Sequence, residues 1–375
     1  MNKNIKCFIQ ITLLIMLFWN CSSNRKDAVE LRTNQQDHLN LENTYKVVQL
    51  EKKTESLLTF ISKSIIDETS DRIFVLSDFN IYIFTEKGNY LTKLKIGRGP
   101  GEINRIISFA TNTKTKTIYA IDDAYKLCAF DYNGNMINKY DIKDFCSFDI
   151  SVLDNDNILL LRNSVGISEK FFVGIYNLTT KKIVKKFISA DESPYSQNSV
   201  ITANNFSQNN GKQYLCITNV FGLFEYRDLD FHKILSFDIG EKAVPKSISD
   251  KFEKEGQCNL REESKSRHFA PFMLFSFCFK GYYFAVIDDN EFNCFAISQA
   301  NNTIYHNGTL PSYFGLPDNK SLRLSSGIQD NSIIFQCSPL DFYDSKDETG
   351  SKEINIANHK ILINQDDNPF LIIVQ

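Results

Sequence analysis

Short apolar runs of four to seven residues, each followed by a polar turn, recur along most of the chain. The clearest set spans residues 71–102, in which Phe74 and Leu76 lie in one run and Ile81 and Ile83 in the next. Runs of this length, rich in β-branched and aromatic residues, favour β-strands over helices. Asp, Asn, Ser and Gly fill the positions between the runs, and these residues suit turn conformations. The pattern predicts three short strands that end in a glycine-rich corner.

An apolar run of four residues followed by a polar pair occurs six times. The copies begin at Ile73 (IFVLSD), Ile118 (IYAIDD), Ile158 (ILLLRN), Tyr214 (YLCITN), Phe284 (FAVIDD) and Ile334 (IFQCSP). Successive copies are 45, 40, 56, 70 and 50 residues apart. Two further apolar runs follow most copies. The first of these runs covers residues 81–84, 127–130, 172–176, 223–226 and 292–297 in successive copies. The second covers residues 90–96, 136–142, 183–188, 232–239 and 303–310.

A repeat of about 40–50 residues that contains only strands and turns is typical of the blades of a β-propeller. One blade cannot bury both of its faces alone, so blades stack around an axis. Six copies predict an all-β fold with six blades, and we interpret the repeated run as the inner strand of each blade. The alternatives are a pair of β-sandwiches or a β-solenoid, but sandwich strands do not recur at this period.

The two ends of the repeat region also carry strand patterns. Residues 45–50 (YKVVQL) form an early apolar run, and residues 369–375 (PFLIIVQ) form the last one. In a closed ring we expect both runs to lie in one blade, as a latch that removes the open edge of the sheet. Truncation at either end would then destabilise the whole ring.

Two stretches interrupt the repeat. Residues 241–267 are densely charged and lie in the longest step, so we expect a partly helical insertion on the rim between blades four and five. This insertion is either a solvated excursion or a lid or docking element, because long loops on a rigid scaffold often carry function. Residues 338–355 interrupt blade six and are rich in acidic side chains.

The first 20 residues predict a signal peptide. Lys3 and Lys6 supply a positive start, and residues 8–19 form an apolar run of 12 that is too short to span a bilayer. Cys21 follows and resembles the residue of bacterial lipoproteins whose thiol receives a diacylglycerol. Several acyl chains together give a stable membrane anchor. The alternatives are cleavage elsewhere or an uncleaved anchor, because bulky residues stand where lipoproteins usually have small ones.

Residues 21–44 are polar and predict a flexible tether. The propeller itself would occupy residues 45–375. The chain carries 42 basic and 45 acidic residues, a net charge of −3, and removal of residues 1–20 leaves 40 basic residues and a net charge of −5. Phosphate binding needs a basic stripe, so we expect no nucleic-acid partner. We expect a monomer. The chain contains 31 phenylalanines, and we expect these large aromatic side chains to fill the space between radially packed blades.

Residues 96–102 (IGRGPGE) form the most conspicuous local motif. The glycine spacing does not match a dinucleotide fingerprint, and no Gly-Lys-Ser or Gly-Lys-Thr follows as in a P-loop. We expect a tight corner from the outer edge of blade one to the inner strand of blade two. Its glycines would permit positive φ, and Glu102 would bond freed N–H groups. Alternatively, Arg98 and Glu102 face the central channel and contact a ligand.

Acidic residues end equivalent strands in several blades, and Asp122 and Asp288 are the candidate binding residues among them. Carboxylates from several blades could bind Ca²⁺, but Asp also stabilises turns by bonding backbone N–H groups. We therefore predict no metal site and no cofactor.

The chain contains none of the catalytic or metal-binding motifs C-x-x-C, H-E-x-x-H and G-x-S-x-G, so no catalytic residue is assigned. Four cysteines within apolar runs are expected to be buried as small hydrophobic residues: Cys128, Cys216, Cys278 and Cys294.

Several features together resemble the six-bladed β-propeller lipoproteins of Gram-negative bacteria, which are distantly similar to NHL-repeat propellers. They are the signal with Cys21, the GRGPGE corner, the polar pairs that close the repeated strands, and the terminal sequence DDNPFLIIVQ. The resemblance spans nearly the whole chain. It implies an envelope-anchored scaffold with this fold and carries over no catalytic residue.

Three hypotheses follow for the function. The first is a non-enzymatic propeller, lipid-anchored in the bacterial cell envelope at the outer membrane, that binds an unidentified protein or glycan-derived partner across one face. The second is a hydrolase or lyase with an active site at the channel mouth and a metal held by Asp122 and Asp288. The third is a sensor or scaffold in envelope assembly that docks through residues 241–267. Propellers host many functions, so the fold does not decide among them.

Overall fold

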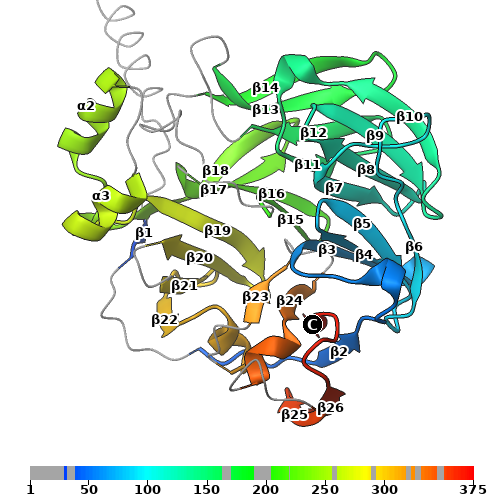
Figure 1. Cartoon of the computed structure of the whole chain (residues 1–375). Helices are drawn as coiled ribbons and strands as arrows, with labels where there is room; N and C mark the ends of the chain where they lie inside the picture. Colours follow the sequence, from blue (N-terminus) through cyan, green and yellow to red (C-terminus); the bar gives the residue numbers. More distant parts are fainter. Residues whose placement is uncertain are drawn as a thin grey trace, which may run out of the picture.

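The computed structural model describes residues 29–31, 39–162, 170–189, 204–218, 220–255, 260–288, 293–317, 322–325, 331–343 and 350–375. Its strands form six antiparallel four-stranded blades around a common axis, which Figure 1 shows nearly end-on. The predicted all-β, six-bladed β-propeller is therefore confirmed. None of the helices in the described ranges combines the length and the apolar character that a membrane crossing requires.

The strands follow one another in chain order within the first five blades. Blade one contains β3 (Ile61–Asp67), β4 (Arg72–Ser77), β5 (Asn80–Phe84) and β6 (Tyr90–Lys93). Blade two contains β7 (Ile106–Asn112), β8 (Thr117–Asp122), β9 (Lys126–Asp131) and β10 (Met136–Asp141). Blade three contains β11 (Asp149–Val152), β12 (Asn157–Leu161), β13 (Phe171–Asn177) and β14 (Lys182–Ser189).

The second half of the ring repeats this order until the last blade. Blade four contains β15 (Phe206–Asn209), β16 (Lys212–Ile217), β17 (Val220–Arg227) and β18 (Asp230–Asp238). Blade five contains β19 (Phe272–Phe279), β20 (Tyr282–Asp288), β21 (Asn293–Ser298) and β22 (Ile304–Gly308). Blade six contains β23 (Leu322–Leu324), β24 (Ile333–Cys337), β27 (Phe370–Val374) and β2 (Tyr45–Gln49).

Each blade begins with a strand that the repeat pattern does not reveal. The repeated apolar runs are the second strands (β4, β8, β12, β16, β20 and β24), so our interpretation of these runs as inner strands is wrong. The first strands lie at the axis, where Lys63 on β3 contacts Ser108 on β7 and Asp149 on β11. The second strand of a blade lies between two other strands of its sheet, and neighbouring blades pack on both faces of that sheet. It is therefore almost entirely apolar and easier to recognise than the strand beside the channel.

The N- and C-terminal strands close the ring as predicted. β2 pairs with β27 over five residues, from Tyr45 opposite Val374 to Gln49 opposite Phe370, and β27 pairs on its other side with β24. Val48 and Leu50 are buried beside this pairing. Blade six is thus completed by residues from both ends of the chain, which is the latch expected from the sequence.

Two short parts of the segment predicted as a flexible tether lie on the propeller. β1 (Val29–Glu30) pairs in parallel with β18, and the Leu31 N–H donates a hydrogen bond to the Asp238 carbonyl at 2.7 Å. Leu31 and Leu39 are buried in the hydrophobic core. The described residues of this segment therefore dock against blades four and five. Cys21 and the predicted signal peptide (1–20) lie outside the described residues.

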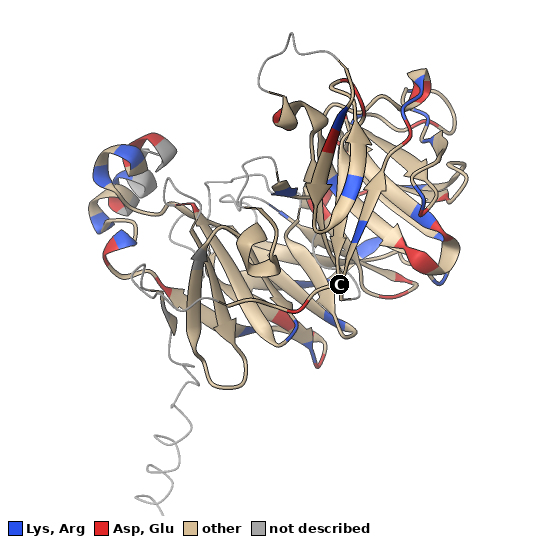
Figure 2. Ribbon diagram, turned by 90° about the horizontal axis from the view of Figure 1, so that it is seen from below, with Lys and Arg blue, Asp and Glu red and all other residues tan. Residues whose placement is uncertain are grey.

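The insertion predicted between blades four and five contains two helices, α2 (Lys246–Glu255) and α3 (Leu260–Arg267). Ile248 is 1% exposed and packs into the core, so α2 is anchored to the ring. Glu263 of α3 pairs with Lys251 of α2 at 3.5 Å and with Arg267 at 3.4 Å. Figure 2 shows both helices, with their charged residues coloured on the ribbon, at one side of the molecule. The two helices lie in the stretch for which the sequence predicted partly helical structure.

The interruption of blade six is a hairpin of β25 (Lys352–Ile356) and β26 (His359–Ile363), which follows the short 3₁₀ helix η7 (Pro339–Phe342). The hairpin leans on the latch strand, because the Gln49 amide donates to the Leu362 carbonyl at 2.7 Å. Ile354 and Ile363 are buried against blade six. This segment therefore adds to the closure of the ring.

Most of the largest fully buried side chains among the described residues are phenylalanines. Phe284 illustrates their packing, since its ring lies 5.1 Å from its cross-strand partner Phe277 in blade five and 5.4 Å from Phe314, measured between centroids. The four cysteines predicted to be buried are buried and free. Burial raises the thiol pKa of Cys128 to about 11 and of Cys216 to about 12, so both remain protonated at neutral pH.

Candidate functional site

The connections between strands fall into two sets at opposite ends of the inner strands. In an antiparallel meander, the first-to-second and third-to-fourth connections share one end, and the second-to-third connections and the links to the next blade share the other. In the described ranges the first set consists of tight turns, such as residues 113–116 and 210–211. The second set holds the glycine-rich corner, the α2–α3 insertion and the β25–β26 hairpin. We call its end the loop-bearing face.

The glycine-rich corner joins β6 to β7 on the loop-bearing face, as predicted. The Gly99 N–H donates to the Glu102 carboxylate at 2.7 Å, which is the role expected for Glu102. The glycines serve two purposes. Gly101 adopts a φ of +77°, whereas a side chain at Gly97 would overlap the Glu102 carboxylate. Arg98 is exposed at the tip of the same corner.

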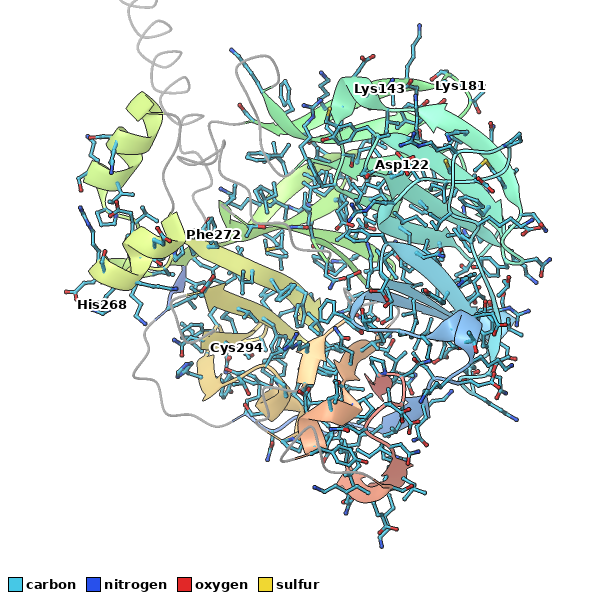
Figure 3. The ribbon with its side chains drawn as sticks, viewed as in Figure 1. Asp122, Lys143, Lys181, His268, Phe272 and Cys294 are labelled. Atoms are coloured by element: carbon cyan, nitrogen blue, oxygen red, sulfur yellow. The ribbon has the colours of Figure 1, made fainter. Side chains whose placement is uncertain are left out.

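The predicted acidic residues all lie at the loop-bearing ends of second strands, but in different blades. Asp122 ends β8, and its carboxylate accepts backbone N–H bonds from Ala124 at 3.0 Å and Lys126 at 2.8 Å. Asp288 ends β20 in blade five and is 5% exposed. Figure 3 shows Asp122 in the part of the ring opposite β20. Within the described residues, no three His, Cys, Asp or Glu side chains are grouped to hold a metal ion.

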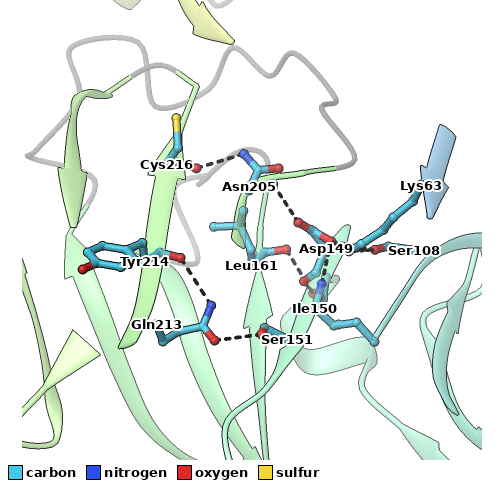
Figure 4. Close-up of polar contacts among 11 residues, drawn as sticks. Lys63, Ser108, Asp149, Ile150, Ser151, Leu161, Asn205, Gln213, Tyr214 and Cys216 are labelled. Atoms are coloured by element: carbon cyan, nitrogen blue, oxygen red, sulfur yellow. Dashed lines mark hydrogen bonds and ion pairs between the residues drawn. The ribbon is translucent and has the colours of Figure 1, made fainter. Parts of the chain in front are cut away.

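A buried polar network lies just below the loop-bearing face in the wall of the central channel (Figure 4). The Lys63 ammonium lies 2.9 Å from the Asp149 carboxylate and 3.2 Å from the Ser108 hydroxyl. Ser108 also donates to Asp149 at 2.6 Å. The backbone N–H groups of Ile150 and Asn205 donate to the two oxygens of Asp149 at 2.9 and 3.0 Å.

This network joins four blades. Lys63 is on β3, Ser108 on β7 and Asp149 on β11, and Asn205 directly precedes β15. Asp149 is fully buried and Lys63 is 6% exposed, so both charges depend on each other and on the surrounding hydrogen bonds. The Asn205 amide extends the network by donating to the Cys216 carbonyl at 3.0 Å. We assign it to holding the inner strands in register around the channel.

The channel contains a small cavity beneath Lys63. Its volume is about 40 Å³, and its lining mixes apolar side chains with the polar side chains of Thr111 on β7, Ser151 on β11, Ser207 on β15 and Gln213 on β16. The Ser151 hydroxyl donates to Gln213 at 3.1 Å. A cavity of this size holds water-sized molecules only. A larger ligand therefore does not fit in this cavity.

The mouth of the channel on the loop-bearing face carries two arginine–phenylalanine pairs. The Arg105 guanidinium carbon lies 3.9 Å from the centroid of the Phe79 ring, and that of Arg323 lies 5.7 Å from the Phe60 ring. Phe79 is in the turn between β4 and β5, whereas Phe60 directly precedes β3. These pairs escape sequence reasoning, because the members of each are brought together by neighbouring blades. The only signal in the sequence is an aromatic residue in a turn of the repeat.

Asp67 is the last residue of the inner strand β3, at the end away from the loop-bearing face, and the turn to β4 begins after it. Burial acts to raise the pKa of Asp67, but hydrogen bonds from neighbouring hydroxyl groups outweigh it and hold this pKa below its ordinary value. One of these bonds comes from the Tyr132 hydroxyl of blade two at 2.9 Å. Burial, together with the Asp67 contact, raises the pKa of Tyr132. The pair therefore joins blades one and two far from the loop-bearing face.

Solved structures that match this chain share little sequence with it. A candidate exported protein from Bacteroides fragilis NCTC 9343 superposes with a TM-score of 0.72 at 14% identity, over 93% of this chain and 99% of that one. The RRP9 WD40 repeats give a TM-score of 0.47 at 8% identity, over 89% and 100% of the two chains. U3-55K gives 0.46 at 8% identity, over 78% and 77%. The first of these likenesses supports the fold alone.

No curated protein matches the sequence. Residues 26–375 match a family described as a domain of unknown function, DUF4934. This match covers the entire ring and residues 26–44 of the predicted tether. The chain therefore belongs to the DUF4934 family.

Proposed function

We propose that this protein is a non-enzymatic binding propeller of the bacterial cell envelope that holds a partner on its loop-bearing face. One observation carries the proposal, namely that the long connections in the described ranges all lie on that face and tight turns occupy the other. Long loops on a rigid scaffold are where binding surfaces usually form. The buried network around Lys63 and Asp149 supplies the rigidity, since it fixes the inner strands beneath that face.

The envelope location has two supports. Residues 1–21 resemble a lipoprotein signal, with Cys21 at the position of the lipidated residue. The Bacteroides fragilis protein with the same fold is described as a candidate exported protein. We extend this location to the present chain and place it at the outer membrane through the lipid on Cys21.

The location is tested with Cys21→Ala in a Bacteroides host. The wild-type protein is expected in the membrane fraction and to incorporate radiolabelled palmitate, and the variant is expected to lose both properties. Equal labelling and equal membrane association of the variant would rule out lipidation at this residue.

Binding on the loop-bearing face is tested by photo-crosslinking in the same host. A photoreactive amino acid is placed at Lys95 or Asp144 on the loop-bearing face, and at Asn155 or Asn210 on the opposite face. All four positions are exposed. We expect adducts of higher mass from the first two positions only. Adducts that arise equally from both faces, or only from the tight turns, would refute the assignment of the face.

A further inference from the structure

The two arginine–phenylalanine pairs lie on connections that contact each other. The Thr59 N–H, beside Phe60, donates to the Asp78 carboxylate, beside Phe79, at 3.3 Å, and the Thr59 hydroxyl donates to the same carboxylate. This contact links the two connections that carry Phe60 and Phe79. The four residues Arg323, Phe60, Phe79 and Arg105 come from blades six, one and two and from the connections that precede them. We call these four residues the arginine–aromatic surface.

This surface exposes apolar area that the fold does not use. Phe60 is 47% exposed and Phe79 is 48% exposed, although phenylalanine elsewhere fills the core. Leu57 and Ile96, which are 51% and 42% exposed, lie in the connections that enter and leave blade one on the same face. Clustered exposed apolar residues of this kind mark interaction sites.

In the part of the chain that the structure describes, neither Arg105 nor Arg323 lies within ion-pair distance of a carboxylate. Asp78 accepts hydrogen bonds from Thr59 and Ser77, and Asp123 accepts one from Asn104. Both carboxylates keep their negative charges, but neither forms an ion pair with the two arginines. The surface therefore presents two guanidinium groups that have no carboxylate partner among the described residues.

We infer that the arginine–aromatic surface binds an acidic, partly apolar segment of a partner protein. This inference rests on the proposed function and specifies its partner. A guanidinium binds a carboxylate through two parallel hydrogen bonds, and a stacked guanidinium is already oriented for that contact. Arginine and aromatic residues are also the residue types that dominate the energetic centre of protein interfaces. The chemistry thus matches glutamate or aspartate side chains that alternate with apolar ones.

The same geometry disfavours a sugar as the occupant. A sugar ring that stacks on an aromatic side chain needs an open ring face, and Arg105 already covers one face of Phe79 at 3.9 Å. Phe60 and Phe79 also have no polar atom with which to bond sugar hydroxyl groups. The exposed apolar area beside the two guanidinium groups therefore favours a peptide with both acidic and apolar side chains.

The test uses the mature full-length chain and short synthetic peptides of equal length. One peptide alternates Glu and Leu, a second alternates Gln and Leu, and a third alternates Lys and Leu. A uronic-acid oligosaccharide is the fourth probe. Affinities are measured by fluorescence anisotropy or by calorimetry. We expect the Glu/Leu peptide to bind at least roughly tenfold more tightly than the other probes, as expected for charge-assisted contacts.

Variants locate the binding on the surface. R105A/R323A is expected to weaken binding of the Glu/Leu peptide by roughly tenfold or more, and R105K/R323K by less, because lysine keeps the charge but not the paired donors. F60S/F79S is expected to weaken binding as well. The matched controls R227A and L229S change exposed residues at a tight-turn end and are expected to leave the affinity unchanged.

Three outcomes would overturn the inference. They are tighter binding of the oligosaccharide than of any peptide, no binding of the Glu/Leu peptide at millimolar concentration, and equal affinities of wild type and R105A/R323A. The crosslinking experiment under the proposed function uses other positions and needs no chosen probe. Adducts from the loop-bearing face without peptide binding would therefore refute the acidic segment and leave the binding face standing.

Discussion

The buried pair of Lys63 and Asp149 offers the sharpest test of how the ring is held together. Removal of either charge is expected to destabilise the propeller far more than removal of both. The substitutions are Lys63→Met and Asp149→Asn, singly and combined, because each is close in size to the residue that it replaces. Asn at position 149 still offers an oxygen to the Ile150 N–H, which now donates to Asp149 at 2.9 Å.

The expected loss of stability follows from the burial of the two charged groups and from the number of hydrogen bonds that they make. Asp149 is fully buried and accepts four hydrogen bonds, and Lys63 is 6% exposed. A single substitution leaves the other charge buried without its partner, which costs about 3–5 kcal/mol of unfolding free energy. The double variant has no unpaired charge. We expect it to lose only about 1–3 kcal/mol, for the bonds that an amide cannot replace.

Urea unfolding is followed by far-UV circular dichroism, because the only tryptophan of the chain is Trp19 in the predicted signal. The coupling energy comes from the full cycle of single and double variants, which isolates the pair. The control is the exposed pair of Lys360 and Glu353, with 3.1 Å between nitrogen and oxygen, where Lys360→Met is expected to cost less than about 1 kcal/mol. The structural role of the buried pair would be refuted if the free-energy costs of the two single substitutions added up to that of the double variant. It would also be refuted if each single substitution cost as little as Lys360→Met.

Three further predictions concern the latch and the first turn. Deletion of residues 1–50 removes β2 with the buried Val48 and Leu50, each worth about 1.5–3 kcal/mol. The melting temperature should fall by many degrees, and a truncated chain that melts like the mature protein would contradict the latch. Gly88→Ala should also destabilise the ring, since φ is +87° and the added carbon would overlap the Gln49 carbonyl of β2; unchanged urea stability would count against this contact. Asp67→Asn tests the lowered pKa. A carboxylate whose folded pKa is depressed contributes stability above its unfolded value, about 3.9, and loses it as pH falls through the folded value. The stability difference from wild type should be present at pH 7 and shrink below about pH 4, whereas a constant difference would show that Asp67 acts through shape alone.

The sequence revealed the strands that are apolar on both faces and hid those that line the channel. β4 and β12 consist almost wholly of large apolar residues, so their period and length are visible without any structure. β11 (DISV) and β15 (FSQN) have four residues each. Polar and apolar side chains alternate in β11, and three of the four side chains of β15 are polar. Such a strand resembles a loop in sequence. For this reason the number of blades was predictable, and the identity of the inner strand was not.

The corner at Gly97–Glu102 was predictable for a related reason, because glycine spacing and a following acid are local chemistry. The buried pair and the arginine–aromatic surface were not. Lys63 and Asp149 are 86 positions apart, and Phe60 and Arg323 lie near opposite ends of the ring region.

The sequence by itself therefore determined the class of fold, the count of blades, the closing strands and the place of the insertions, since each depends on residues that are close in the chain. Only the tertiary structure decided which side chains meet at the axis and at its mouth. Closure of the ring brings together the first strands and turns of separate blades, and no local pattern records which of them become neighbours.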